Sequence, residues 1–118
     1  MKKILYVIIF LCIISACTGR REYREVLSNA QSVIEERPDS SLAILDALGR
    51  HSDAFGEHFR MQYLLELTYA KAKMGHLFDT DSLTKALVNH FDGNGTCREK
   101  SLAYYMNGCA LCDIGQTP

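Results

Sequence analysis

Thiols and imidazoles are the side chains of this 118-residue chain whose chemistry could go beyond packing, and it carries five cysteines and four histidines. Cys109 and Cys112 form a Cys-x-x-Cys motif, a spacing found in thiol-redox proteins. Such a motif normally follows a β-strand at the start of a helix, and no strand pattern precedes Cys109. We therefore interpret the two cysteines as small apolar residues on a packed helix face. A thiol-redox protein using Cys109 and Cys112 is kept as the weaker alternative.

The spacing of the other ligand-type residues speaks against a metal site. Cys97 lies twelve residues before Cys109 on the same predicted helix, which separates them by about 18 Å. There is no second Cys-x-x-Cys motif, and no two histidines stand four residues apart. We expect no metal, no cofactor and no enzymatic activity, since a Gly-x-Ser-x-Gly elbow is also absent. The histidines are expected to be solvated surface residues: His51, His58, His76 and His90.

The N-terminus has the three-part layout of a secretory signal. Lys2 and Lys3 form a basic head, residues 4–14 are uncharged and apolar, and the small residues Ser15 and Ala16 follow. The apolar run is too short to cross a bilayer, which takes roughly 20 residues. We therefore predict a signal peptide over residues 1–16.

The end of this segment resembles the lipobox of bacterial lipoproteins, in the order Ile14, Ser15, Ala16, Cys17. The resemblance implies that Cys17 receives a diacylglycerol thioether, that the chain is cut before it, and that acyl chains such as palmitate hold it at a membrane. Residues 17–21 would form a lipidated tether. The alternative is an uncleaved signal anchor in which Cys17 is idle.

Residues 18–21 indicate which side of the outer membrane the protein would face. Surface export of Bacteroides-type lipoproteins is associated with acidic residues directly after the lipidated cysteine, whereas this chain has Thr18, Gly19, Arg20 and Arg21. The comparison implies a cell-envelope protein anchored to the outer membrane and facing the periplasm.

Five segments of helical period follow, and no strand alternation accompanies them. The first carries an apolar face from Tyr23 to Ile34 and ends before Pro38. The second is expected to be capped by Asp39 or Ser40 and to stop at Gly49. The third covers about 56–74, and its wide apolar arc predicts that it is covered on two sides. The last two are expected from a cap at Asp79 or Thr80 to the breaker 92–95, and over 97–114. We predict an all-α fold.

The helical segments also repeat. The stretch DSSLAILDAL at 39–48 has a counterpart in DSLTKALVNHF at 81–91, and the two Asp-Ser pairs are 42 residues apart. A period of this size with two helices per unit is typical of an α-solenoid, in which antiparallel helix pairs stack and bury their apolar faces against one another. Gly75 and Gly115, which are expected to end the third and fifth helices, repeat at 40 residues.

Within the fifth segment, four residues stand at the spacing of the first-helix signature of tetratricopeptide (TPR) repeats: Tyr104, Gly108, Leu111 and Gly115. Nearly all of residues 22–118 resembles lipid-anchored TPR proteins of Bacteroides-type bacteria. The resemblance implies a TPR-like helical-repeat domain over 22–118 in which a partner helix packs closely at Gly108. The second-helix half of the signature is missing, so we expect the domain to be truncated at its C-terminal end. Tyr105 and Leu102 are the candidate partner surface.

These patterns favour a non-enzymatic, lipid-anchored helical-repeat module that mediates protein–protein interaction in the cell envelope. Its expected partners are the membrane, through lipid on Cys17, and an unknown protein or peptide. A formal net charge of −1 gives no reason to expect nucleic acid. The alternative is a fragment or short relative of an envelope sensor or regulator with TPR repeats, since longer relatives continue with further domains.

Overall fold

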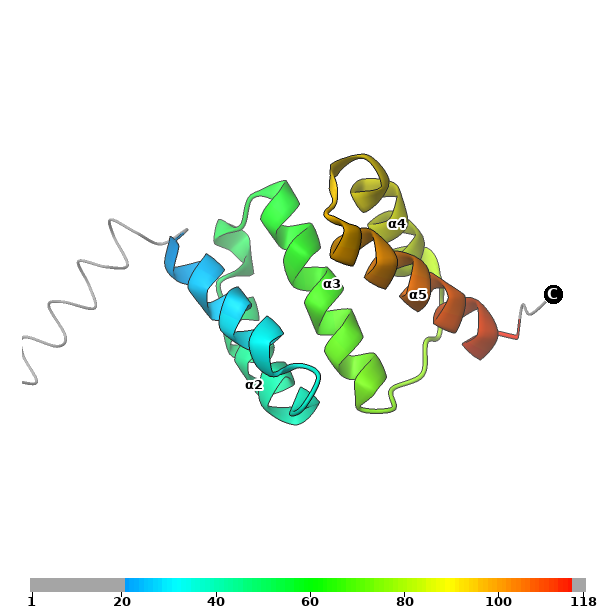
Figure 1. Cartoon of the computed structure of the whole chain (residues 1–118), viewed down its shortest axis with the longest axis horizontal. Helices are drawn as coiled ribbons and strands as arrows, with labels where there is room; N and C mark the ends of the chain where they lie inside the picture. The colour runs from blue at the N-terminus through cyan, green and yellow to red at the C-terminus, as the bar shows by residue number, and fades with distance from the viewer. Residues whose placement is uncertain (1–20, 116–118) are drawn as a thin grey trace, which may run out of the picture.

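The computed structural model describes residues 21–115 (Figure 1). All regular structure in this range is helical, which confirms the all-α prediction. The elements are a helix over residues 21–33, α2 (Pro38–Gly49), a short 3-10 helix η1 (Ser52–Ala54), α3 (Glu57–Lys73), α4 (Ser82–Asn94) and α5 (Cys97–Asp113). The signal peptide, the lipobox residues Ile14, Ser15 and Ala16, and the lipidation residue Cys17 lie outside the described residues.

None of the helices between residues 21 and 115 has the length and apolar character needed to cross a membrane.

The predicted N-terminal cap of α2 is wrong, because the helix begins earlier in the chain than expected. Arg37 is the N-cap, with φ −136° and ψ 72°, and no side chain caps the helix there. Pro38 occupies the first turn, where its fixed φ suits a helix and its missing N–H costs nothing. The helix therefore begins before Asp39 and Ser40 can act as caps.

The predicted cap of α4 is also misplaced. Asp81 is the N-cap, again without a side-chain cap, while the Thr80 hydroxyl accepts a hydrogen bond from the Ser82 N–H at 3.2 Å. At its other end α4 continues through Asn94, beyond the first residues of the predicted breaker 92–95. The Asn94 side-chain amide donates to the carbonyl of His90 at 3.1 Å, a local bond that supports this last turn.

Glycine ends two helices as predicted. Gly75 has φ +86° and Gly115 has φ +81°, in the left-handed region that side chains disfavour. After α3, the Gly75 N–H bonds the Ala72 carbonyl and the His76 N–H bonds the Lys71 carbonyl, each at 3.0 Å. This is the Schellman arrangement, which satisfies carbonyls left free at a helix end.

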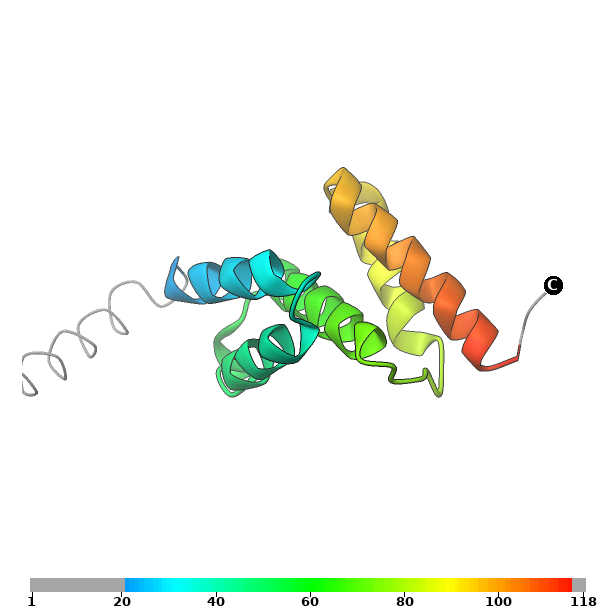
Figure 2. The same cartoon turned by 60° about the horizontal axis from the view of Figure 1, so that its bottom comes forward.

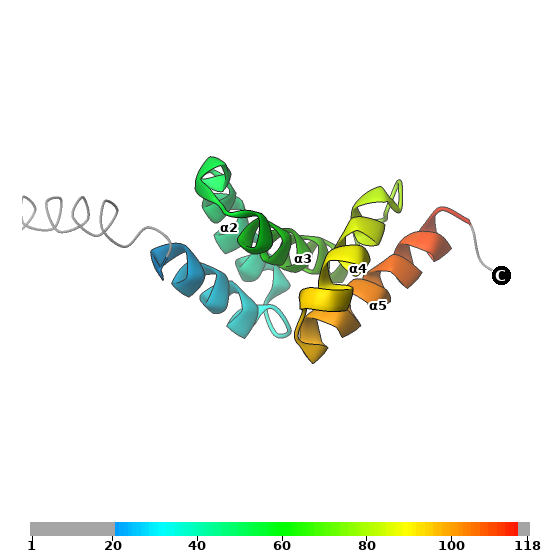
Figure 3. The same ribbon diagram turned by 90° about the horizontal axis from the view of Figure 1, so that it is seen from above.

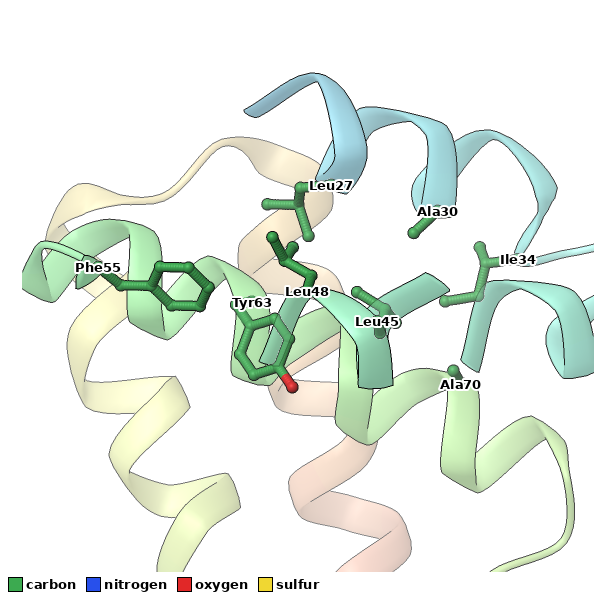
Figure 4. Packing of buried hydrophobic residues seen from close by; sticks show 8 residues of the cluster. All are labelled: Leu27, Ala30, Ile34, Leu45, Leu48, Phe55, Tyr63 and Ala70. Carbon is green, nitrogen blue, oxygen red and sulfur yellow. The ribbon is translucent and has the colours of Figure 1, made fainter. Parts of the chain in front are cut away.

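The first hydrophobic core lies between the helix over 21–33, α2 and the facing side of α3 (Figure 4). Its buried members are Leu27, Ala30, Ile34, Leu45, Leu48, Phe55, Tyr63 and Ala70. The close fit has a direct consequence at Gly49, where a Cβ would collide with the Tyr63 hydroxyl. Buried Ser41 also joins α2 to the first helix by donating to the Ala30 carbonyl at 2.8 Å.

The second core lies between α3, α4 and α5, and its buried members are Leu65, Leu87, Phe91, Ala103 and Met106. The α3 helix belongs to both cores, since Tyr63 and Ala70 face the first and Leu65 faces the second. This confirms that α3 is covered on two sides. Figures 1 and 2 show α3 between the N-terminal helices and the α4–α5 pair. The helices α4 and α5 lie side by side.

The helix faces toward the second core differ from those that the apolar pattern predicts. The pattern predicts one face in the fourth helix, Leu83, Ala86, Leu87 and Phe91, and two apolar stripes in the fifth, Tyr104–Leu111 and Leu102–Tyr105–Cys109–Cys112. In α4 Leu83 and Ala86 are exposed, and the smaller Thr84 is buried with Leu87 and Phe91. The Thr84 hydroxyl lies 3.0 Å from Asn107 Oδ1 of α5, and this contact gives the buried polar group a partner. In α5 the buried residues are Glu99, Ala103, Met106 and Ala110, so neither predicted apolar stripe is the buried one.

Candidate functional site

Polar contacts join α3 to α5 beside the second core. Glu66 of α3 is fully buried, and the guanidinium of Arg98 on α5 donates to both of its oxygens, at 2.6 and 2.9 Å. The hydrogen bond to Glu66 raises the pKa of Arg98 above its ordinary value. A bidentate pair fixes both position and orientation. The two charged residues therefore set how α5 sits on α3.

A second contact lies nearby, between Gln62 and Glu99. The Gln62 amide donates to the Glu99 carboxylate at 2.9 Å, and the same carboxylate accepts from the Thr96 N–H at 2.9 Å. Burial by itself raises the pKa of Glu99, but the bonds from Thr96 and Gln62 outweigh it, and the pKa is lowered. Thr96 and Glu99 form a capping box, which the pattern Thr-x-x-Glu at 96–99 could have revealed.

Glu35, Tyr69 and Lys73 form a third cluster, on the surface where the first helix ends against α3. The Tyr69 hydroxyl donates to Glu35 at 2.7 Å and the Lys73 ammonium donates to it at 3.0 Å. The bond from Tyr69, followed by the bond from Lys73, lowers the pKa of Glu35. Tyr69 and Lys73 thereby present a fixed ring and a fixed cation next to α5.

A groove of about 250 Å³ lies between the C-terminal half of α3, the following loop and α5. Figure 3 shows α3 next to the α4–α5 pair. Its lining combines aromatic rings with one ammonium and one carboxylate: Tyr69, Lys73, His76, Phe78, Tyr105, Cys109 and Asp113 are among its residues. The Asp113 carboxylate is engaged by the backbone N–H of Phe78 at 3.0 Å. Such a surface offers apolar area and a cation, which suit an extended peptide segment.

The outer face of α5 carries two exposed aromatic rings. Tyr104 and Tyr105 are 53% and 60% exposed, and Tyr105 also lines the groove. The Tyr104 hydroxyl donates to Asp92 at 3.1 Å, and this bond raises the pKa of Tyr104. The aromatic ring is thus held at the surface and not buried.

The predicted repeat-packing residues all lie on α5 or just after it, and none of them is in either core. Tyr104 and Gly108 are exposed, Leu111 is half-buried, and Gly115 follows the helix end. A Cβ on Gly108 would meet nothing within 4 Å, so no described helix packs closely there. Of the candidate partner surface, Tyr105 is exposed and Leu102 is half-buried against the second core.

The three described thiols are free. Cys109 is half-buried and Cys112 is exposed, both in the last turns of α5 and away from a helix N-terminus. The contact of Cys109 with the hydroxyl of Tyr105 raises the pKa of that tyrosine. The expectation that both cysteines lie on a packed face is wrong for Cys112, because the buried side of α5 is centred on Ala103, Met106 and Ala110.

The contact that sequence reasoning missed is between two histidines. His58 Nδ1 lies 2.8 Å from His90 Nε2, and the ring centroids are 5.0 Å apart. The residues are 32 positions apart in the chain, so local spacing could not reveal them. An antiparallel arrangement of the third and fourth predicted helices would have placed the start of one beside the end of the other.

Of the remaining histidines, His51 stacks on Tyr23 with centroids 5.5 Å apart, and His76 is exposed. Between residues 21 and 115, no group of three or more histidines, cysteines and acidic residues is gathered closely enough to hold a metal ion. Comparison of the chain with protein-family models, curated proteins and solved structures found no match.

Proposed function

We propose that this chain is a non-enzymatic, lipid-anchored module of TPR-like helical repeats that binds a protein or peptide in the cell envelope. The observation that carries the proposal is the groove between α3 and α5, bordered by the exposed ring of Tyr105 and by Lys73. Aromatic side chains that stay in solvent at the edge of a groove supply large contact area when a partner covers them.

The helices suit this role because their contacts follow a stacking order. The α3 helix contacts α2 on one side and α4 and α5 on the other, so each helix pair shares a face with the next. In an α-solenoid this order produces extended surfaces along the first helices of successive pairs. The α3–α5 groove lies between the helices at residues 57–73 and 97–113, and this position supports the assignment of these two as first helices.

The binding claim can be tested by site-specific photo-crosslinking in cells that naturally carry the protein. A photoreactive phenylalanine analogue at Tyr105 should give one discrete crosslinked species, because this position borders the groove. The same analogue at Ala43, which is exposed on α2, is the matched control and should give none. Equal products from both positions, or no product from Tyr105, would contradict the proposal.

The anchoring claim needs a separate test because it depends on Cys17. We expect labelled palmitate to enter the wild-type chain and not the Cys17→Ser variant. An inhibitor of lipoprotein signal peptidase should lead to accumulation of a larger form of the wild-type chain. Incorporation of palmitate into the Cys17→Ser variant at the wild-type level would rule out Cys17 as the attachment point.

A further inference from the structure

The His58–His90 pair joins two helices at the end of the molecule away from their connecting loop. His58 is in the first turn of α3 and His90 is in the last turns of α4, whereas the chain connection between them runs through residues 74–81. The two helices make few other contacts compared with those that α4 makes to α5. A ligand held by both imidazoles would therefore clasp α3 to α4 where nothing covalent does.

The two ring nitrogens face each other with room for a single proton between them. At 2.8 Å one nitrogen donates and the other accepts, so at least one of them carries a free lone pair. A tautomer shift at the donor releases the second lone pair, because a neutral imidazole has one nitrogen of each kind. Both can then serve as metal ligands. The bound cation takes the place of the shared proton, which has moved to the other nitrogen of the donor ring, so both imidazoles stay neutral.

The displacement that the two nitrogens need favours one class of cation. With metal–nitrogen bonds of 2.0–2.1 Å, neighbouring ligands at right angles are about 2.9 Å apart, whereas tetrahedral ligands are about 3.3 Å apart. The nitrogens are 2.8 Å apart when they share a proton, so the right-angle spacing needs the smaller displacement. Square-planar and tetragonal sites with nitrogen ligands are typical of Cu²⁺ and Ni²⁺, whereas Zn²⁺ prefers tetrahedral sites.

The surroundings hold one ring and leave the other free to adjust. The His90 ring packs edge-on against buried Phe91, with centroids 4.9 Å apart. His58 is exposed, and its ring is tilted by 35° to that of His90. His58 is therefore the ring that has the freedom to rotate until the two lone pairs converge on one point.

Room for the remaining ligands lies beside His58. A hollow of about 290 Å³, which His58 helps to line with Glu57 and Arg24, opens to solvent there. Water molecules can occupy the positions that the protein leaves open. We propose that His58 and His90 form a two-imidazole site for a divalent cation of tetragonal preference, Cu²⁺ or Ni²⁺, with water completing its coordination.

The test is a thermal melt of the full chain, purified in mild detergent, with and without Ni²⁺. Ni²⁺ is used because Cu²⁺ would oxidise free thiols such as the three between residues 21 and 115. At a metal concentration about tenfold above Kd, we expect Tm to rise by about 6–10 °C. The rise should vanish in His58→Gln and in His90→Gln, and it should persist in the control His76→Gln, whose side chain is exposed elsewhere.

A spectroscopic measurement locates the ion independently of stability. Paramagnetic Ni²⁺ at substoichiometric concentration should broaden the amide resonances around residues 58 and 90 first. Zn²⁺ should raise Tm less than Ni²⁺ at the same concentration. The proposal is overturned by no Tm rise, by an equal rise in the two histidine variants, by broadening centred elsewhere, or by Zn²⁺ acting as strongly as Ni²⁺.

Discussion

Arg98 of α5 donates two hydrogen bonds, of 2.6 and 2.9 Å, to the carboxylate of Glu66 on α3, which has no exposed surface. The Arg98 side chain remains 44% exposed. The Glu66–Arg98 pair connects α3, which contributes to both cores, to α5. A buried carboxylate is tolerated only while its charge is compensated, so the position of α5 depends on this contact.

Replacement of Arg98 by methionine is expected to lower the free energy of unfolding by about 2–3 kcal/mol, because it leaves the Glu66 charge buried without a partner. The double variant Glu66→Met/Arg98→Met should recover most of the loss, since an apolar pair can replace a buried ion pair at little cost. Urea denaturation of the two variants and the wild type measures both values. A single variant within about 0.5 kcal/mol of wild type, the range of ordinary surface substitutions, would contradict the assigned role.

Acid should destabilise the protein in part through Glu99. Its pKa in the folded protein lies below the ordinary value of 4.5, so its ionised form stabilises the fold above that value. This contribution is lost as pH falls from about 4.5 through the lowered pKa. The variant Glu99→Gln should therefore show a smaller loss of stability over this range than wild type, as measured by urea denaturation at several pH values. Equal losses of stability in the two proteins would show that Glu99 does not contribute to the acid sensitivity.

Two glycines should respond in opposite directions to the same substitution. Gly75→Ala places a Cβ at φ +86° and is expected to destabilise the protein by about 1 kcal/mol. Gly108→Ala lies inside α5 in open space and should stabilise the described fold by about 0.5–1 kcal/mol. Thermal denaturation of both variants checks the signs. Destabilisation by Gly108→Ala would show that a part of the protein outside residues 21–115 packs against that position.

The two cores should unfold together, because α3 contributes to both. Leu45→Ala in the first core and Leu87→Ala in the second each remove a fully buried side chain and should cost about 3 kcal/mol. In each variant we expect one cooperative transition at lower temperature, measured by circular dichroism and calorimetry. A second transition in either variant would mean that the two cores are separate folding units.

Much of the helical layout could be predicted from the sequence. The interior bounds of α3 and α5 follow from their periodicity and from the glycines after them, since a residue with positive φ ends a helix wherever the chain is placed. Caps were less predictable. Pro38 starts α2 ahead of the expected Asp39 or Ser40, and Asp81 starts α4 two residues after Asp79, because several polar residues compete for the same role.

The faces of the helices were harder to predict than their bounds. Tyr104 and Tyr105 were expected to mark apolar stripes of α5, yet the buried side carries Ala103, Met106 and Ala110. Small residues on the buried side let α5 approach α3 and α4, and the bulky rings remain at the surface. Hydrophobicity alone ranks tyrosine and alanine too similarly to choose between these faces.

By itself, the sequence determined that this chain is helical between residues 21 and 115 and where two of the helices stop, whereas lipid anchoring at Cys17 stays a prediction. These properties depend on neighbouring residues in the chain. Only the tertiary structure decided that Glu66 meets Arg98, that His58 meets His90, and that the rings of Tyr104 and Tyr105 face solvent. Each of these depends on the packing of helices remote in sequence, which local periodicity does not encode.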